Sequence, residues 1–508
     1  MTPSTEVTSW SELVTTALLG TDRRPLPGAA DADPATALLD RAALDTVGRR
    51  AGLLPGRAAP ATPPAPEDPR PALPEAASHR LVMLLPAPGS SSGSGSLANV
   101  NELLPQYLAA ANSHGYRVPA ALVPPLLDAA RARSELRGDA VELAGPLGRW
   151  LADRNPDWRY LLRTPVRGDG DGQDDGQRLW QEGLFAERVT HLTRLRRRDP
   201  AAARELLTGS WSTERAEDRL LFLDALQENL SADDEPFLES ALSDRSKNVR
   251  LTAAELLSTL PGSALGRRMA ERARAAVRLT ADGARVTVHA PTGCDAAMQR
   301  DGIPATSPTG RSERAFWLGE IVAATPLDIW CEQLGTPGVG TPAEVLALPV
   351  SEEWAMDLHD AWARAAVRQN DAAWARALLT GVGPGPGTAA KLLAVLPPEE
   401  RARWTADFLA GSQGLGDVFQ LLVACPAPWP QPLADAVIQA LTRVAAGGGY
   451  PWSHSGVLGV AERALPPEAA DRLDALAADA DSAWSEMFTR LAATLRLRAT
   501  MLSELSNR

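Results

Sequence analysis

The sequence has few cysteines and contains no long apolar run. Its three cysteines, Cys294, Cys331 and Cys425, lie far apart and form no CxxC pair, so they indicate neither a disulfide framework nor a zinc knuckle. No uninterrupted apolar stretch reaches the roughly 18 residues of a membrane span. Glu6 and Asp22 stand where a signal peptide would need basic and apolar residues. We therefore expect a cytoplasmic protein that does not enter a membrane.

Lysine is almost missing. Of 51 basic residues only Lys247 and Lys391 are lysines, and we interpret the preference for arginine as GC-rich coding bias. The net charge of −12 disfavours attraction to nucleic acid or to an anionic membrane surface. We interpret the basic run at 194–198 as a solvated helix face. Neither nucleic acid nor a membrane is an expected partner.

Aromatic residues are also scarce, at 5 %, whereas 44 % of the residues are hydrophobic. A β-sandwich or barrel would need more aromatic and β-branched residues. Alanine, leucine, arginine and glutamate dominate instead, and these residues favour helices. A chain of 508 residues is long enough for several domains or for one elongated array. The composition predicts a mostly all-α protein.

Periodicity and composition divide the chain into seven segments. We expect N-terminal helices over 1–54, a Pro/Ala- and Gly/Ser-rich linker region over 55–96, a helical segment over 97–165, an acidic Gly/Asp loop over 166–177, HEAT-like helical repeats over 178–276, a β-hairpin and loop insertion over 277–313, and C-terminal helical repeats over 314–508. The first helix is expected to begin at a cap provided by Ser9 or Ser11 and to end at Gly20. A second should cover 34–51.

One short segment breaks the helical pattern. Two alternating apolar runs flank Asp282-Gly283, which is a typical hairpin turn. Pairing about this turn sets Leu279 opposite Val286 and Val277 opposite Val288. The following residues, 290–311, are rich in Gly and Pro and are interpreted as a loop.

The clearest repeated unit covers residues 241–260. A short turn at 244–248 joins two apolar helical patterns, and it resembles a HEAT repeat, with Asp244 in the turn and Arg250 early in the second helix. We expect the Asp244 carboxylate to accept hydrogen bonds from helix N-terminal amides and Arg250 to bridge to a neighbouring turn. Weaker echoes begin at Asp199 and Asp371, in keeping with the period of roughly 40–47 residues of HEAT and armadillo arrays. The sequence therefore predicts a HEAT-like α-solenoid of helix pairs with a small β-hairpin insertion.

Tryptophans recur at about one per predicted helix in the second half of the chain. They are Trp317, Trp330, Trp354, Trp362, Trp374 and Trp404. A tryptophan stripe at helical spacing usually packs in a core. We predict core or inter-repeat packing for these residues, in preference to a ligand cage.

Three stretches imitate catalytic or binding motifs. Residues 89–93 match GxSxG, but they lie in a Gly/Ser run without the flanking strand and helix of a nucleophile elbow. The glycine-rich stretch 381–387, with Lys391 after it, contains prolines that remove the amides a phosphate would need. The stretch 169–175 begins like a calcium loop but departs from it at later positions. We interpret them as a linker, a hinge and an acidic loop.

His359 beside Asp357 and Asp360 is the only histidine with carboxylates as close neighbours in the sequence. On a helix this group is interpreted as a solvated face. The sequence thus assigns no catalytic, cofactor-binding or metal-ligating residue and implies no cofactor. A site assembled from distant carboxylates stays open, because such residues meet only in the fold.

Several stretches together resemble an uncharacterised bacterial domain-of-unknown-function family with HEAT-like repeats, typical of high-GC genomes. They are residues 10–23, the segment around Val249-Arg250, residues 294–303 and residues 314–318. Members of that family look to be encoded beside a MoxR-type AAA+ ATPase, a von Willebrand A-type protein and a SWIM zinc-finger protein. The resemblance implies, by association, an accessory subunit of an ATPase-driven remodelling system.

Three functions compete at this point. The first is a non-enzymatic scaffold or adaptor that offers a helical surface to a protein partner, the AAA+ ATPase or the von Willebrand A-type protein. The second is a HEAT-like nucleic-acid-binding protein or DNA glycosylase-like enzyme, for which Arg131, Arg133, Arg137 and the arginines of 194–198 would have to form one basic surface. The third is a hydrolase built from distant carboxylates. The acidic net charge favours the first.

Overall fold

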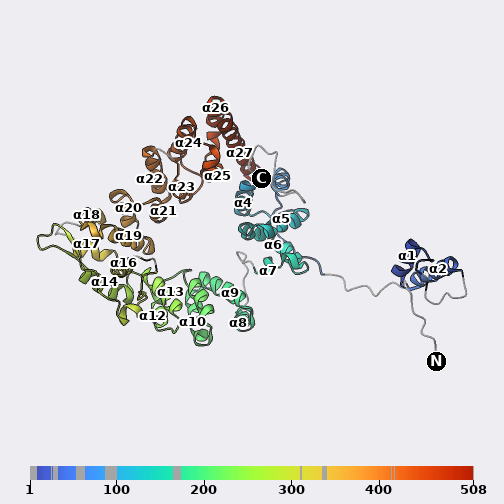
Figure 1. Cartoon of the computed structure of the whole chain (residues 1–508), viewed down its shortest axis with the longest axis horizontal. Helices are drawn as coiled ribbons and strands as arrows, with labels where there is room; N and C mark the ends of the chain where they lie inside the picture. The colour runs from blue at the N-terminus through green and yellow to red at the C-terminus, as the bar shows by residue number, and fades with distance from the viewer. Residues whose placement is uncertain are drawn as a thin grey trace. The chain divides into compact units, whose positions relative to one another are not determined.

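A computed structural model of the protein shows a helical chain with one small hairpin (Figure 1). It describes residues 9–24, 26, 33–52, 63–85, 100–163, 173–308, 310, 312–334, 340–412, 415, 416 and 418–506. These residues form 27 α-helices and one two-stranded sheet, so the predicted mostly α-helical fold is confirmed. Within the same ranges, none of the helices has the length and apolar character needed to traverse a bilayer. The chain divides into two compact units, Met1–Ala65 and Pro66–Arg508.

The smaller unit is a pair of helices. They are α1 (Trp10–Leu19) and α2 (Pro34–Gly52). Of the two predicted caps Ser9 is the one used: its side chain accepts from the Glu12 amide, and the Glu12 carboxylate accepts from the Ser9 amide at 2.7 Å. Gly20 ends α1 as predicted, with a φ of 87° that favours glycine. The Arg49 guanidinium lies 4.8 Å from the centre of the Trp10 ring and links the two helices.

The larger unit begins with five helices. They are α3 (Glu75–Leu84), α4 (Val100–Ser113), α5 (Val123–Ala132), α6 (Arg137–Ala152) and α7 (Tyr160–Arg163). Helix α3 lies inside 55–96, so the linker prediction is wrong for this stretch. Its Ala77, Leu81 and Leu84 are buried, and the Tyr107 hydroxyl of α4 donates to the Ala77 carbonyl at 2.7 Å. A helix of ten residues is marginal in water by itself, and packing on α4 stabilises it. The Gly/Ser run 89–96 lies outside the described residues.

The rest of the larger unit is a succession of helices interrupted by the hairpin. The first part comprises α8 (Gln173–Glu182), α9 (Phe185–Arg198), α10 (Pro200–Ser210), α11 (Ala216–Ala225), α12 (Glu235–Ala241), α13 (Lys247–Ser258), α14 (Ala264–Ala276), β1 (Val277–Leu279), β2 (Val286–Val288) and α15 (Ala296–Arg300). The second part comprises α16 (Glu313–Ala323), α17 (Asp328–Leu334), α18 (Pro342–Ala347), α19 (Glu352–Arg368), α20 (Ala372–Gly381), α21 (Pro386–Val395), α22 (Pro398–Gly411), α23 (Phe419–Val423), α24 (Gln431–Ala446), α25 (Ser455–Ala464), α26 (Ala470–Asp479) and α27 (Ser482–Ser506).

Helices that are not consecutive also touch. Helix α9 packs on α11 and α11 on α13; α16 packs on α19, α19 on α21, α21 on α23 and α23 on α25. A row of helices therefore lies side by side through the unit (Figure 1). Helix α8 begins at Gln173, inside the predicted acidic loop 166–177, while residues 164–172 lie outside the described part of the chain.

The predicted turn at Asp244 joins α12 to α13. Its carboxylate accepts from the Ser246 amide at 2.8 Å and from the Arg219 guanidinium of α11 at 2.5 Å. Arg250 donates to the carbonyls of Asp244 and Arg245, at 2.7 and 3.1 Å. The expected bridge to a neighbouring helix exists, but Arg219 makes it, whereas Arg250 is turned back onto its own turn. Sequence spacing alone does not reveal which arginine reaches across.

The β-hairpin forms with the predicted register. Val277 lies opposite Val288 and Leu279 opposite Val286, and the turn residue Gly283 has a φ of 71°. Both Val277 and Val286 are buried, and the Val286 amide donates to the Pro349 carbonyl at 2.8 Å. The apolar face thus packs on the surrounding helices, as an isolated hairpin would require.

The segment after the hairpin, predicted to be a loop, contains the short helix α15. The Asp295 carboxylate caps it by accepting from the Met298 amide at 2.7 Å. Met298 and Ile303 are buried in the same core as the hairpin. Neighbouring Gly and Pro residues conceal this single turn of helix in the sequence.

Arg196 is buried in the core of the unit, although the run 194–198 was predicted to be a solvated face. The side chains of Arg196 and Asp234 are both 0 % exposed and form two hydrogen bonds of 2.9 Å. Backbone carbonyls, including those of Glu228 and Asn229 at 3.0 Å, accept from the rest of the guanidinium. Arg204 adds a third bond to Asp234, at 3.0 Å. The prediction was therefore wrong for Arg196, which faces inward on α9.

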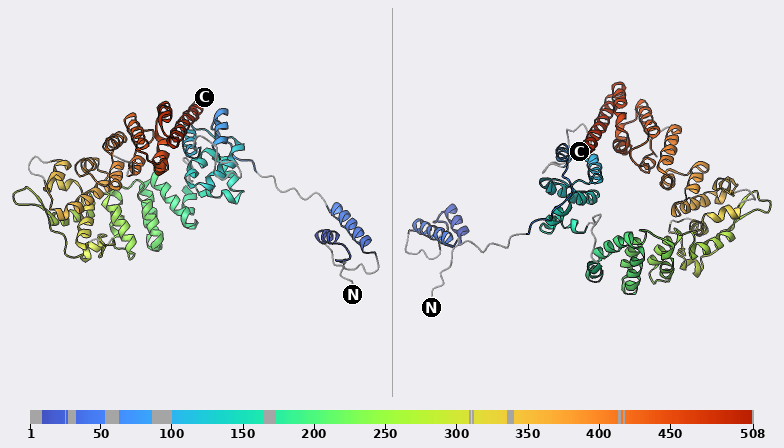
Figure 2. Two further views of the ribbon diagram at one scale, coloured as in Figure 1. Left: turned by 45° about the horizontal axis from the view of Figure 1, so that its top comes forward. Right: turned by 180° about the vertical axis from the view of Figure 1, so that it is seen from behind.

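The last helix joins the two ends of the larger unit. Helix α27 packs on α25 and α26 and also on α3 and α4, which lie beside it in the figures (Figure 1, Figure 2). Met501 and Leu505 are buried in the core of α3–α7, and Arg80 makes a two-bond pair with Glu504, at 2.7 and 3.1 Å. The beginning of this unit is thus held by its final helix.

We predict that Asp234→Asn lowers the free energy of unfolding by about 3–5 kcal/mol, because it leaves the Arg196 charge buried without a partner. The measurement is equilibrium urea unfolding followed by circular dichroism.

Burial by itself raises the pKa of Asp234, but hydrogen bonds from Arg196, the Ser231 amide and Arg204 outweigh it and hold that pKa below its usual range. The stabilisation is then full above about pH 4 and is lost as the pH falls through the lowered pKa. The variant should lose less stability than the wild type between about pH 5 and 3.

The matched control is Arg197→Gln. Arg197 pairs with Glu228 at 2.6 Å, but its side chain is 58 % exposed. We expect this change to alter stability by less than about 1 kcal/mol. Equal effects of the two substitutions would contradict the assigned role of the buried pair.

A second prediction concerns α27. Leu505→Ala should open a cavity in the core of α3–α7, with a cost of about 2–5 kcal/mol. Hydrogen exchange measured by mass spectrometry should accelerate in α3, α4 and the last turns of α27 and stay unchanged in α9–α13. Leu502→Ala is the control, because Leu502 is 38 % exposed on the same helix. Faster exchange in α9–α13 would contradict the prediction, because it would show that Leu505 stabilises helices far from the core of α3–α7.

Candidate functional site: a groove across four helices

A hollow of about 480 Å³ crosses four helices of the larger unit. It is formed by α13, α16, α19 and α21, which belong to the row of helices described above. Its lining residues are Glu255, Ala315, Phe316, Gly319, Glu320, Asp357, Asp360, Ala363, Arg364, Val367, Arg368, Thr388 and Lys391. We call this hollow the groove.

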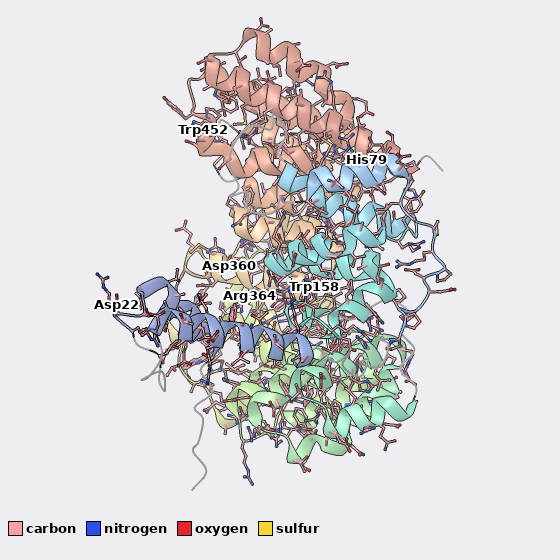
Figure 3. All side chains as sticks on the ribbon, turned by 90° about the vertical axis from the view of Figure 1, so that its right-hand side faces the viewer. Asp22, His79, Trp158, Asp360, Arg364 and Trp452 are labelled. Carbon is pink, nitrogen blue, oxygen red and sulfur yellow. The ribbon has the colours of Figure 1, made fainter. Side chains whose placement is uncertain are left out.

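One face of α19 supplies much of the lining. Asp357, Asp360, Arg364 and Arg368 are three or four residues apart, so they share one side of the helix. Figure 3 labels Asp360 and Arg364, one turn apart on α19. The other side of α19 carries buried residues such as Trp362. The amphipathic sequence of α19 therefore turns its charged side toward the groove.

Ion pairs cross the groove between helices. Arg364 of α19 pairs with Glu320 of α16 at 2.6 Å. Arg368 forms two bonds with Glu255 of α13, at 3.0 and 2.6 Å. Glu255 is 55 % exposed, so water and salt weaken its attraction to Arg368. These pairs tie α13, α16 and α19 together at the surface.

Gly319 makes room for one of these pairs. A Cβ atom at this position would lie 2.9 Å from Nη2 of Arg364. A larger side chain on α16 would push the guanidinium away from its present position. Glycine at 319 thus leaves room for the present position of the Arg364 guanidinium.

Apolar atoms line the groove between the charges. Phe316 and Val367 are partly buried, and Ala315 and Ala363 add smaller apolar surfaces. Apolar and charged surfaces therefore stand side by side along the groove.

Two smaller hollows continue the groove. One of about 130 Å³ shares Glu255, Glu320 and Arg368 with it. The next, of about 140 Å³, shares Ile303 and Pro304 with the second and ends at Lys247 and Arg250. The three hollows therefore adjoin one another in series, and we call this series the path; the loop after the hairpin provides part of its wall.

The lining of the groove contains no histidine or cysteine. Within the described ranges, no set of three or more His, Cys, Asp or Glu side chains is arranged to hold a metal ion. His359 is half-buried against the Trp362 ring, 5.8 Å between centroids, and burial lowers its pKa although Asp360 opposes this. Burial also raises the pKa of the thiols of Cys294, Cys331 and Cys425, which makes them poor nucleophiles at neutral pH.

The structure separates the residues that stood together in the sequence. Asp357 and Asp360 line the groove, whereas His359 between them packs inward, so the three do not converge. Lys391, which follows the glycine-rich stretch 381–387 that was interpreted as a hinge, lines the groove. A charged stripe opposite the buried side of α19 was visible in the sequence, but nothing there distinguished it from an ordinary solvated face.

Other predictions have clear outcomes. The tryptophans pack as predicted: Trp317, Trp330, Trp354, Trp362 and Trp374 are buried, and Trp404 stacks on Phe408 at 5.4 Å. The GxSxG match at 89–93 lies outside the described residues. Of the acidic stretch 169–175, only residues 173–175, at the start of α8, are described.

Four of the seven arginines proposed as a basic surface are engaged in ion pairs. Arg131 pairs with Asp157 at 3.0 Å, Arg133 with Glu135 at 2.8 Å and Arg197 with Glu228, and Arg196 is buried. Their carboxylate partners offset the charge that a phosphate backbone would need. This arrangement lends no support to the nucleic-acid hypothesis.

Comparison with known proteins identifies a family without assigning an activity. A family model described as a family of unknown function, DUF5691, matches residues 12–505. No curated protein and no solved structure gives a significant match.

We predict that the surface pair of Glu255 and Arg368 contributes less than about 1 kcal/mol. A double-mutant cycle of Glu255→Gln and Arg368→Gln, measured by urea unfolding in 0.15 M salt, should give a coupling energy in this range that falls further at about 1 M salt. A coupling above about 2 kcal/mol would mean that the groove charges hold the fold together. The small expected value allows the groove to be altered without unfolding the protein.

Proposed function

Since the chain belongs to DUF5691, a family of unknown function, we propose on physical grounds that it is a non-enzymatic scaffold or adaptor for a protein partner. The partner would bind along the groove formed by α13, α16, α19 and α21. The observation that carries the proposal is the groove itself, in which apolar surface alternates with charges that are paired across helices.

The proposed architecture is a HEAT-like α-solenoid of helix pairs. The α12–α13 pair, with its Asp244 turn, supports this proposal, and so does the side-by-side row that includes α16, α19, α21 and α23. In such arrays each repeat contacts its neighbours, and the stacked helices present an extended binding surface. The groove would then be one part of that surface.

The proposed partner class is a MoxR-type AAA+ ATPase or a von Willebrand A-type protein, by association with the bacterial family that the sequence resembles. The chain would act as an accessory subunit of the remodelling system. The proposed location is the cytoplasm, where thiols stay reduced, and all three cysteines are free thiols.

Site-specific photo-crosslinking tests this proposal. A photoreactive phenylalanine analogue at Phe316, inside the groove, should form adducts with a specific protein in the native host, identified by mass spectrometry as one of the two proposed classes. The same analogue at Met83 is the control, since Met83 is 68 % exposed on α3, far from the groove in sequence and outside its lining. Adducts that are absent at Phe316, or equal at both positions, would refute the groove as the binding surface.

A further inference from the structure

The two lysines of this protein line the two ends of the series of adjoining hollows. Lys391 lines the groove, and Lys247 lines the hollow at the other end of the linked series. The remaining basic residues of the 51 are arginines. Coding bias accounts for the arginines, but it does not account for both lysines lying along the same surface path.

Both lysines are exposed and have no ionic partner among the described residues. No carboxylate in that part of the chain lies within the 4.0 Å of an ion pair from either ammonium group. The groove arginines differ, because Arg364 and Arg368 already pair with Glu320 and Glu255. The ammonium groups are therefore the cations of this path that remain open to a ligand.

The surroundings of each lysine define what it can accept. Near Lys247, the Arg250 guanidinium donates to two carbonyls, so its positive charge adds to that of the lysine. Near Lys391, the groove carries Asp357 and Asp360, each of which has an interaction of its own. Their negative charge disfavours a continuous row of anions such as a nucleic-acid backbone. Single carboxylates at the two ends fit this charge distribution.

Apolar surface occupies the space between the lysines. Leu251, Ile303 and Pro304 line the Lys247 half, and Phe316 and Val367 line the Lys391 half. Lys247 and Glu255 are separated by ~12 Å along α13 at 1.5 Å per residue. Packed helices lie about 8–10 Å apart, so the three steps from α13 to α21 bring the whole path to roughly 30–40 Å. An extended peptide of about ten residues covers most of that length.

We propose that this path binds an extended segment of the partner protein with acidic residues at both ends and apolar residues between them. Lys247 and Lys391 contact the terminal carboxylates, and the segment's apolar side chains pack between Pro304 and Phe316. This inference rests on the proposed scaffold function and adds the chemistry of the recognised segment.

The scarcity of lysine provides a direct test. Reductive ¹³C-methylation of the full chain labels Lys247, Lys391 and the α-amino group and keeps their positive charge. The probes are synthetic decapeptides. One has a single acidic residue at each end around apolar residues alternating with serine. A second carries glutamine in place of both acidic residues, and two more are acidic at one end only. A polyglutamate peptide of equal length reports non-specific attraction.

With the first peptide, both dimethyl-lysine signals should shift and yield one common dissociation constant. The single-ended peptides should bind about tenfold more weakly, and the glutamine peptide should cause no shift. Lys247→Gln and Lys391→Gln should each weaken binding of the first peptide about tenfold, measured by fluorescence anisotropy. Arg403→Gln, an exposed change on α22, should leave the affinity unchanged.

The absence of shifts, shifts of one lysine only, or equal binding of polyglutamate would each overturn the proposal. Such a failure is distinguishable from failure of the scaffold function. If crosslinking at Phe316 captures a partner while the lysine signals do not respond, the groove binds a partner of other chemistry. If neither experiment gives a signal, both proposals are wrong.

Discussion

Burial of each helix against other helices is the constraint on which this structure depends. The described residues contain only a three-residue pair of strands, so no sheet is available to cover the apolar faces. Each helix gains stability when its apolar stripe packs on a neighbour. In the larger unit α13 packs on α11 and α14, α16 packs on α14 and α19, and α19 packs on α16, α20 and α21. This double packing brings the polar sides of α13, α16, α19 and α21 together at one surface.

Arginine provides most of the polar links between the packed helices. Its planar guanidinium makes two parallel bonds to a carboxylate, as in Arg196 with Asp234, Arg80 with Glu504 and Arg368 with Glu255. These pairs join helices that are distant in sequence. Because arginine fills the structural positions, the two lysines are free to serve at the surface, and both lie on the path that includes the groove.

The sequence allowed prediction of features that depend on neighbouring residues. The Ser9 cap, the Gly20 terminus, the hairpin register and the buried tryptophans all follow from short spacings, and each is confirmed. The predictions for two features that depend on a distant partner were wrong. Arg196 looked like part of a solvated run because its partner Asp234 lies on another element, and α3 looked like linker because its buried face needs α4.

The sequence by itself determined that the chain is helical, that it carries one hairpin, and where α1 and α2 begin and end, because 3.6-residue and two-residue periods are local properties. Only the tertiary structure decided where a groove exists. Glu255 and Arg368 form a bond across 113 positions, and Lys391 lies yet further along the chain. A hollow is a property of the space between packed helices, and the packing is fixed by all their buried faces at once. The charged side of α19 reads as an ordinary solvated face until α13, α16 and α21 lie beside it.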